Sequence, residues 1–189
     1  VEVCFATPGT SDMHLVSAIG NSERMRPVLC LFEGVASGAA DGYARMTDKP
    51  ALTLLHLGSG FANSMANQHN AKRAHVPLIN MVGEHATYHL QYDAPLTSDV
   101  AGHARLVSDF VRVSESADDL PQAAVDAFAP RHRTGDGPGD APVRVQLEVR
   151  MQLGWVRCSI FAGCKNHQIA ASRDHNIRKL PFVQVAGIV

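Results

Sequence analysis

Apolar residues occur in short runs along the chain, and polar or small residues separate the runs. The runs are rich in Val, Leu and Ile and are mostly apolar on both faces, which is typical of strands that helices cover on both sides. The last run differs, because apolar and polar residues alternate in it. The predicted strands lie at residues 3–6, 28–32, 51–55, 77–82, 106–113 and 143–149.

Helical patterns fill most of the intervals between these runs. The predicted helices lie at residues 11–19, 34–46, 61–74 and 117–128. Regular alternation of strand and helix with short connections predicts an α/β fold, with a doubly wound, mainly parallel sheet of about six strands and helices on both faces. Ligands of such sheets bind outside the carboxyl ends of the strands.

Residues 1–150 are expected to form one domain, and residues 151–189 a tail whose structure the sequence does not predict. A loop rich in Gly, Pro and Asp at 130–142 precedes the last predicted strand, and no clear periodicity follows residue 150. The chain opens with Val1, directly before its first apolar run. We therefore expect that the first helix of the domain is missing and that the tail is truncated or aberrant.

Composition narrows the classes of function. The chain of 189 residues carries 17 Lys and Arg against 18 Asp and Glu, a net charge of -1, which argues against binding to nucleic acid or to an anionic membrane surface. No run approaches the roughly 20 apolar residues of a membrane-spanning helix, so we expect a cytoplasmic protein. His85 and His89 are four residues apart but lack a third ligand at a suitable spacing, so no metal site is predicted in this chain.

Glu33 is the first candidate for chemistry. It follows an apolar run and precedes Gly34, which places it at the carboxyl end of a predicted strand. A carboxyl group there, flanked by apolar surface, can share a proton with a nitrogen of a ligand. The alternative is an acidic residue in the first turn of a helix, where the helix dipole favours it. Position alone leaves both interpretations open.

Small residues dominate the segment that follows Glu33. Three glycines lie within 34–42, and each costs about 1 kcal/mol in a helix relative to alanine, so a packing reason is expected for them. Asp41 and Arg45 are four residues apart and are predicted to pair along one helix face.

The pattern as a whole resembles the pyrimidine-binding domain of thiamine-diphosphate-dependent enzymes such as acetolactate synthase and benzoylformate decarboxylase. Its most specific part is Glu33, seven further residues, and then Asp-Gly-Tyr-Ala-Arg at 41–45. Pro8-Gly9 precedes this part, and Gly-x-Gly-x-x-Asn at 58–63 follows the next predicted strand. The resemblance extends over residues 3–150.

The resemblance implies a catalytic role for Glu33. In the family, a glutamate at this place hydrogen-bonds N1′ of the aminopyrimidine ring and so promotes loss of the C2 proton from the thiazolium ring. The cofactor then accepts the electrons released when a 2-keto acid loses carbon dioxide. Pro8, Gly9, Ser59 and Asn63 are implied as further contacts to the cofactor. Ordinary turn chemistry and helix capping are the alternative for each of these four residues.

The same resemblance implies thiamine diphosphate as the cofactor, with Mg²⁺ held by a diphosphate-binding domain that this chain lacks. The triplet Gly135-Asp136-Gly137 is not interpreted as that metal motif, because it follows a predicted helix and continues into a loop. The family allows FAD, which no residue here indicates. The expected partners are a small-molecule 2-keto acid substrate, the diphosphate-binding domain of the same or a neighbouring subunit, and further copies in a homo-oligomer.

Three functions remain as alternatives. The first is the N-terminal part of a 2-keto acid decarboxylase or carboligase that resembles the acetolactate synthase large subunit. The second is a catalytically incomplete cofactor-binding fragment or partner subunit, and we expect negligible turnover by this chain alone. The third is a nucleotide-binding domain with the same alternation of elements; it is disfavoured because the dinucleotide glycine fingerprint is absent. The sequence does not identify which 2-keto acid is used.

Overall fold

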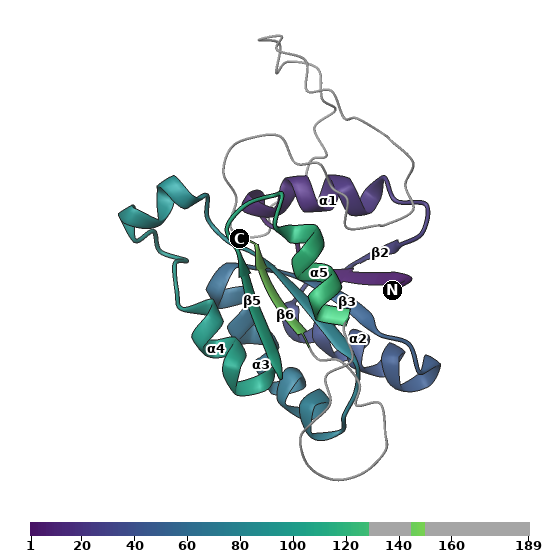
Figure 1. Cartoon of the computed structure of the whole chain (residues 1–189). Helices are drawn as coiled ribbons and strands as arrows, with labels where there is room; N and C mark the ends of the chain where they lie inside the picture. The colour runs from purple at the N-terminus through teal and green to yellow at the C-terminus, as the bar shows by residue number, and fades with distance from the viewer. Residues whose placement is uncertain (129–144, 150–189) are drawn as a thin grey trace.

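A six-stranded parallel sheet forms the centre of the protein (Figure 1). The computed structural model describes residues 1–128 and 145–149, and within them the strand order is β2-β1-β3-β4-β6-β5. All neighbouring strands run parallel. The strands are β1 (Val3–Ala6), β2 (Arg26–Leu29), β3 (Ala51–His56), β4 (Leu78–Gly83), β5 (Phe110–Ser114) and β6 (Val145–Val149).

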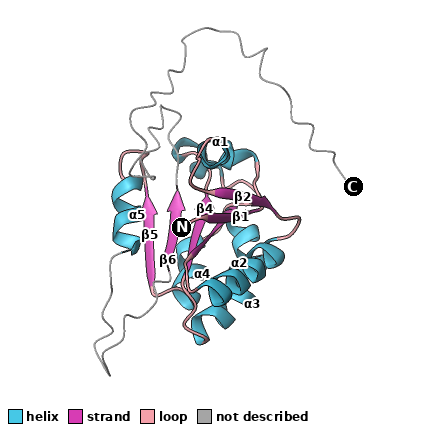
Figure 2. Ribbon diagram, turned by 90° about the vertical axis from the view of Figure 1, so that its right-hand side faces the viewer, coloured by secondary structure: helices cyan, strands magenta, loops and turns pink. Residues whose placement is uncertain are grey.

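Helices cover both faces of this sheet (Figure 2). Helices α2, α3 and α4 pack together on one face, and α1 and α5 pack on the other. The predicted doubly wound α/β fold is thereby confirmed. The helices are η1 (Thr10–Asp12), α1 (Met13–Gly20), α2 (Glu33–Thr47), α3 (Leu57–Arg73), η2 (Thr87–Tyr92), α4 (Val100–Val107) and α5 (Leu120–Phe128), where η marks a short 3-10 helix.

The core follows from the alternation of side chains along the strands. In β1, Val3 and Phe5 pack toward α2, α3 and α4, while Cys4 and Ala6 pack toward α1 and α5. The central strands β3 and β4 are buried along almost their whole length. Burial of both faces explains why these strands read as nearly continuous apolar runs.

One predicted strand is wrong in its position and its burial. The run at 28–32 is not a buried strand, because β2 lies at the edge of the sheet, ends at Leu29 and leaves Leu31 96% exposed. Pro27 lies within β2, and an edge position suits proline because it has no N–H for a second neighbouring strand. Glu33 therefore begins a helix after an exposed segment and does not end a buried strand.

A second correction concerns a helix that the sequence patterns did not predict. The predicted strand at 106–113 begins at Phe110, since α4 occupies the residues up to Val107. Asp99 caps this helix, and its carboxylate accepts a hydrogen bond from the backbone N–H of Gly102 at 2.7 Å. The predicted tail at 151–189 and the triplet at 135–137 lie outside the described residues and stay predictions.

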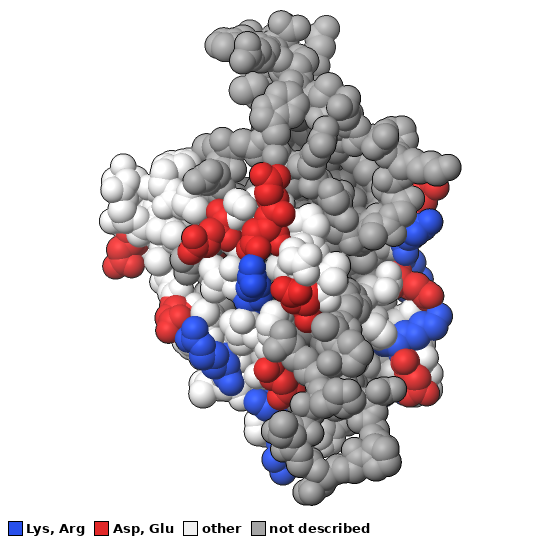
Figure 3. Space-filling model, viewed as in Figure 1, with Lys and Arg blue, Asp and Glu red and all other residues white. Residues whose placement is uncertain are grey.

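Acidic and basic side chains are mixed on the described surface. On the face drawn in Figure 3, residues of both signs lie near one another. Two ion pairs illustrate this, Arg112 with Asp119 at 2.6 Å and Lys49 with Glu2 at 2.8 Å. Among the helices that the structure describes, none combines the length and apolar content needed to cross a membrane.

The glycines of α2 differ in what surrounds them. A Cβ on Gly38 would lie 3.3 Å from the amide nitrogen of Asn67 on α3, which is a close approach between two helices. A Cβ on Gly42 would have no heavy atom within 4 Å. The interpretation that packing requires every glycine of this helix is therefore wrong for Gly42. The predicted pair is present, with Arg45 Nε 3.0 Å from a carboxylate oxygen of Asp41.

Gly42→Ala is expected to raise the free energy of unfolding by about 0.5–1 kcal/mol, because alanine loses less backbone entropy than glycine in a helix. Gly38→Ala is the matched comparison, since the same substitution one turn earlier has to displace Asn67 and should gain less or destabilise. Urea denaturation of both variants measures the difference. A Gly42→Ala protein less stable than the wild type would show that this surface has an unseen packing role.

Candidate functional site

The topological switch point of the sheet lies between β1 and β3. Helix α1 follows β1 on one face of the sheet, whereas α3 follows β3 on the opposite face. In open α/β sheets, ligands bind where adjacent parallel strands send their connections to opposite faces. Residues 8–12 after β1 and residues 56–60 at the end of β3 are therefore the expected walls of a site.

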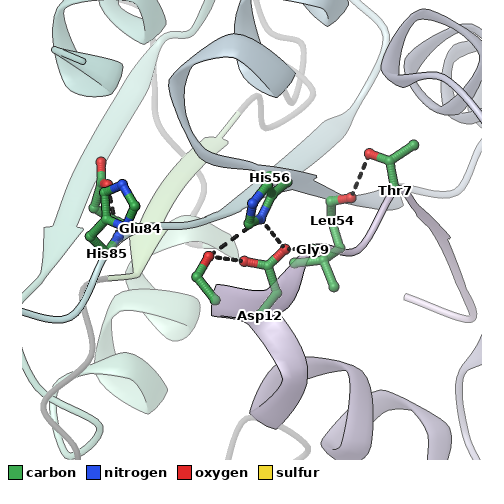
Figure 4. Close-up of polar contacts among 8 residues, drawn as sticks. Thr7, Gly9, Asp12, Leu54, His56, Glu84 and His85 are labelled. Carbon is green, nitrogen blue, oxygen red and sulfur yellow. Dashed lines mark hydrogen bonds and ion pairs between the residues drawn. The ribbon is translucent and has the colours of Figure 1, made fainter. Parts of the chain in front are cut away.

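Asp12 is completely buried at this switch point. Figure 4 shows its carboxylate beside Gly9 and facing the ring of His56. It accepts hydrogen bonds from the backbone N–H of Gly9 and from the hydroxyl of Ser11, each at 3.0 Å, and Nδ1 of His56 lies 3.1 Å away. Gly83, at the end of β4, leaves room for the carboxylate, since a Cβ there would collide with it.

His56 is the last residue of β3, and its ring lies against Gly9. The hydrogen bond with Asp12 raises the pKa of His56 above its usual 6.5; burial opposes this change, and the charges of Asp12, Glu33 and Glu84 add to it. The side chain is 20% exposed, and its Nε2 has no hydrogen bond to any described residue. His56 thus presents a nitrogen that can carry a proton at the carboxyl edge of the sheet.

Glu33 lies at the same edge, and a residue of α3 holds its side chain by a hydrogen bond. Nδ2 of Asn63 donates a hydrogen bond to Oε2 of Glu33 at 3.0 Å. The other oxygen, Oε1, lies over Gly60, where a Cβ would come within 3.1 Å of it. Within the described part of the chain, Oε1 accepts no hydrogen bond. One oxygen of this carboxyl group is therefore fixed, and the other is left for a ligand.

The structure brings part of the predicted site together. Asn63 contacts Glu33 directly, as expected for a shared site. Gly9 belongs to a second group, through its backbone bond to Asp12. Pro8 and Ser59 are exposed at the same edge, and no hydrogen bond joins either of them to Glu33 among the described residues.

The predicted turn at 58–60 is instead the first turn of α3. The chain changes direction at Leu57, whose φ of 54° lies in the left-handed region that residues with a side chain rarely adopt. Conformations of this kind cost about 1–3 kcal/mol and cluster at functional sites. The strain lies directly after His56, which agrees with a ligand site at this point.

The segment after β4 lies beside the switch point and adds two titratable groups. Glu84 is buried, and its Oε1 accepts a hydrogen bond from the backbone N–H of His85 at 2.8 Å. Burial lowers the pKa of His85, and the nearby His89 and His56 lower it further. In residues 1–128 and 145–149, no group of three His, Cys, Asp or Glu is arranged to hold a metal ion.

Asp12 and His56 were not among the residues predicted from the sequence. A signal was available, because each follows the carboxyl end of a predicted strand closely, as Glu33 seemed to do. The spacing of metal ligands does not detect a contact between residues 44 positions apart.

Comparison with known proteins agrees with this geometry. A family model described as the N-terminal TPP binding domain of thiamine pyrophosphate enzymes matches residues 1–104. The chain is 57% identical over 129 residues to a Mycobacterium tuberculosis protein named "Putative acetolactate synthase large subunit IlvX", which covers 68% of this chain and 25% of that protein. It is 30% identical over 146 residues to benzoylformate decarboxylase of Pseudomonas aeruginosa, and the match covers 76% of this chain and 26% of that protein.

A solved structure supports the same relation. The thiamine diphosphate-dependent 4-hydroxybenzoylformate decarboxylase of Rhodococcus jostii matches with a TM-score of 0.66 and 25% identity, over 79% of this chain and 27% of that one. The fold is an α/β domain with a candidate ligand site at the switch point of its parallel sheet. The chain belongs to the thiamine pyrophosphate enzyme family, through its N-terminal cofactor-binding domain, so the resemblance seen in the sequence is confirmed. It spans about a quarter of the length of the relatives that it matches.

Proposed function

We propose that this chain is the pyrimidine-binding part of a thiamine-diphosphate-dependent 2-keto acid decarboxylase or carboligase, in which Glu33 activates the cofactor. The observation that carries the proposal is the state of the Glu33 carboxyl group. Asn63 fixes Oε2, while Oε1 faces Gly60 and has no described partner. A carboxyl group held on one side and open on the other is suited to share a proton with a ring nitrogen.

The residues present fit the aminopyrimidine end of thiamine diphosphate. Gly60 leaves space beside the carboxyl group, so that the backbone can approach a planar ring closely. Glu33 would hold a proton between Oε1 and the ring nitrogen, and Asn63 would keep the carboxyl group oriented. When bound, the cofactor supplies the electron sink for decarboxylation. Further contacts at the same edge are proposed for Pro8, Gly9 and Ser59.

His56 would be the second proton carrier of this site. Its raised pKa keeps a larger fraction of the ring protonated near neutral pH than for an ordinary histidine. A protonated imidazole at the carboxyl edge can attract an anionic 2-keto acid and can donate a proton to it. The proposed substrate class therefore fits the charge of this group as well as the position of Glu33.

An exposed apolar surface beside Glu33 indicates that another domain or subunit packs at this place. Its members flank Glu33 in the chain, and all four are exposed: Leu29, Leu31, Phe32 and Val35. Contiguous exposed apolar side chains mark interaction surfaces. We infer that a diphosphate-binding domain of the same or a neighbouring subunit covers this surface and holds the diphosphate and Mg²⁺.

Calorimetric titration tests the proposal. The chain is titrated with thiamine diphosphate in the presence of Mg²⁺, first alone and then joined to a diphosphate-binding domain. The joined protein is expected to bind on the order of 10²-fold more tightly, because it holds both ends of the cofactor. NAD serves as the control ligand and is expected not to bind. Tighter binding of NAD than of thiamine diphosphate would favour the nucleotide-binding alternative.

A catalytically incomplete cofactor-binding subunit is the second candidate. The exposed apolar surface at Leu29, Leu31, Phe32 and Val35 favours it, because a subunit that completes its site with another chain presents such a surface. The two candidates differ in one assay, which follows decarboxylation of a 2-keto acid with and without an added diphosphate-binding domain. Turnover that depends on the added domain would support the first candidate. Cofactor binding without turnover in both conditions would support the second.

A further inference from the structure

Asp12 directs its carboxylate away from the helix that it precedes. It occupies the N-cap position of α1, where an aspartate usually accepts a hydrogen bond from the first turn, yet its side chain forms no capping bond. The carboxylate bonds instead to the N-cap Gly9 and to Ser11 of the preceding turn η1, and to His56 of β3. Burying a carboxylate is costly unless it is fully bonded, so this arrangement needs a reason beyond helix capping.

The polar contacts of His56 all use one ring nitrogen. Nδ1 lies 3.1 Å from Oδ2 of Asp12 and 3.3 Å from Oγ of Ser11. A carboxylate can only accept hydrogen bonds, so it selects the form of the ring in which Nδ1 carries a hydrogen. Nε2 lies on the other side of the ring, is free of described partners, and belongs to the edge where the charge of Glu33 also acts on the ring.

We propose that Asp12 is a positioning residue, which fixes the orientation and the tautomer of His56 so that Nε2 exchanges a proton with a ligand bound beside Glu33. Two glycines make this arrangement possible, because side chains at Gly9 and Gly83 would collide with the imidazole and the carboxylate, respectively. The link to turnover rests on the proposed function, whereas the effect of Asp12 on His56 does not.

Charged groups from several elements act on His56. Asp12 belongs to the connection between β1 and α1, Glu33 begins α2, and Glu84 follows β4; all three favour the protonated ring, and the bond to Asp12 is the largest contribution. His85, next to Glu84, faces the same region, and burial together with His89 and His56 lowers its pKa and so disfavours its charged form. An amide in place of the Asp12 carboxylate should therefore lower the pKa of His56 while Glu33 and Glu84 continue to act.

The first test is NMR of the imidazole nitrogens in the whole chain, with the His56 signals assigned from a His56→Gln variant. In the wild type, neutral His56 is expected to carry its hydrogen on Nδ1 and to titrate above its usual pKa. In Asp12→Asn, the pKa should fall and the Nε2–H tautomer should appear. Asp99→Asn is the matched control, because Asp99 is also an aspartate at a helix N-cap, but its carboxylate bonds to Gly102 of α4 and is not among the groups that shift the pKa of His56.

Unchanged tautomer and pKa in Asp12→Asn would overturn the proposal, as would a wild-type ring with its hydrogen on Nε2. Loss of the native fold is checked by dispersion of the backbone amide signals. If Asp12→Asn unfolds, the readout passes to Asp12→Glu and Ser11→Ala. Ser11→Ala keeps Asp12 and should keep the raised pKa and the Nδ1–H tautomer, whereas Asp12→Glu displaces the carboxylate and should reduce the preference for Nδ1–H. An unchanged tautomer in Asp12→Glu would overturn the proposal.

The second test separates this proposal from the proposed function in the protein joined to a diphosphate-binding domain. Exchange of the cofactor's C2 proton depends on Glu33 and should be unchanged in Asp12→Asn. The high-pH limb of the kcat profile should move to lower pH in Asp12→Asn. If the wild type is active and the high-pH limb does not move in Asp12→Asn, the positioning role of Asp12 in turnover is overturned. Absence of C2 exchange in the wild type would instead contradict the proposed function, and the NMR result would still decide the effect of Asp12 on His56.

Discussion

Glu33→Gln is expected to slow exchange of the cofactor's C2 proton by about 10²- to 10⁴-fold in the complete enzyme, which is the usual effect of losing a general acid–base group. Glutamine keeps the shape of the side chain and can still accept the hydrogen bond that Asn63 donates at 3.0 Å. It cannot share an acidic proton with a ring nitrogen. Proton NMR of samples quenched in acid after mixing with deuterated buffer measures the exchange rate.

The control for this variant is Glu23→Gln, which removes an exposed carboxylate before β2. It is expected to leave the exchange rate unchanged, because Glu23 is not at the carboxyl edge of the sheet. The free energy of unfolding of both variants should lie within about 0.5 kcal/mol of the wild-type value, as is usual for substitutions outside the core. Exchange at the wild-type rate in Glu33→Gln would contradict the catalytic role. Glu33 would then be an acidic residue in the first turn of α2, where the helix dipole favours it.

The central strands were predictable because both of their faces are buried. β3 and β4 each lie between two neighbouring strands and under helices on both sides. The predicted range 51–55 ends one residue before β3 does, and the predicted range 77–82 is shifted by one residue from β4. The prediction failed at 28–32, where Leu31 and Phe32 are apolar but exposed. An apolar run shows that residues avoid water, but it does not show whether a core or a partner covers them.

The two halves of the candidate site were predictable to different degrees. Glu33 and Asn63 were found through the motifs of a family, and the structure joins them by a hydrogen bond. Asp12 and His56 belong to no periodic pattern, and only the topology of the sheet brings the ends of β1 and β3 together. Spacing detects neighbours along one helix or strand, whereas a contact across strands depends on the strand order.

The same limitation applies to a polar network in the core. Thr53 and Asn80 are paired residues of β3 and β4, and Gln68 reaches them from α3. Oδ1 of Asn80 accepts hydrogen bonds from the Thr53 hydroxyl at 2.7 Å and from the Gln68 amide at 2.5 Å, and Asn80 donates one back to Gln68 at 3.0 Å. All three side chains are buried. A shift of either strand by one residue would break this network, so it contributes to the register of the central pair.

Asn80→Leu is expected to lower the free energy of unfolding by about 2–5 kcal/mol. Leucine has a similar shape, but it leaves the Thr53 hydroxyl and the Gln68 amide buried without partners, and each orphaned group costs about 1–3 kcal/mol. Urea denaturation measures the loss. Asn70→Leu is the matched control, because Asn70 is exposed on the same helix as Gln68 and should change stability by no more than about 0.5 kcal/mol.

A double-mutant cycle decides whether the network or the volume of the side chain sets this cost. Gln68→Leu combined with Asn80→Leu removes both amides, so the double variant should be more stable than the sum of the two single losses predicts, by about 1–3 kcal/mol. Strict additivity would mean that the two amides do not stabilise each other and that steric misfit of leucine explains each loss. A coupling of the expected sign would instead show that the cost comes from leaving one partner unpaired in the core, which is why the two amides have to be retained or lost together.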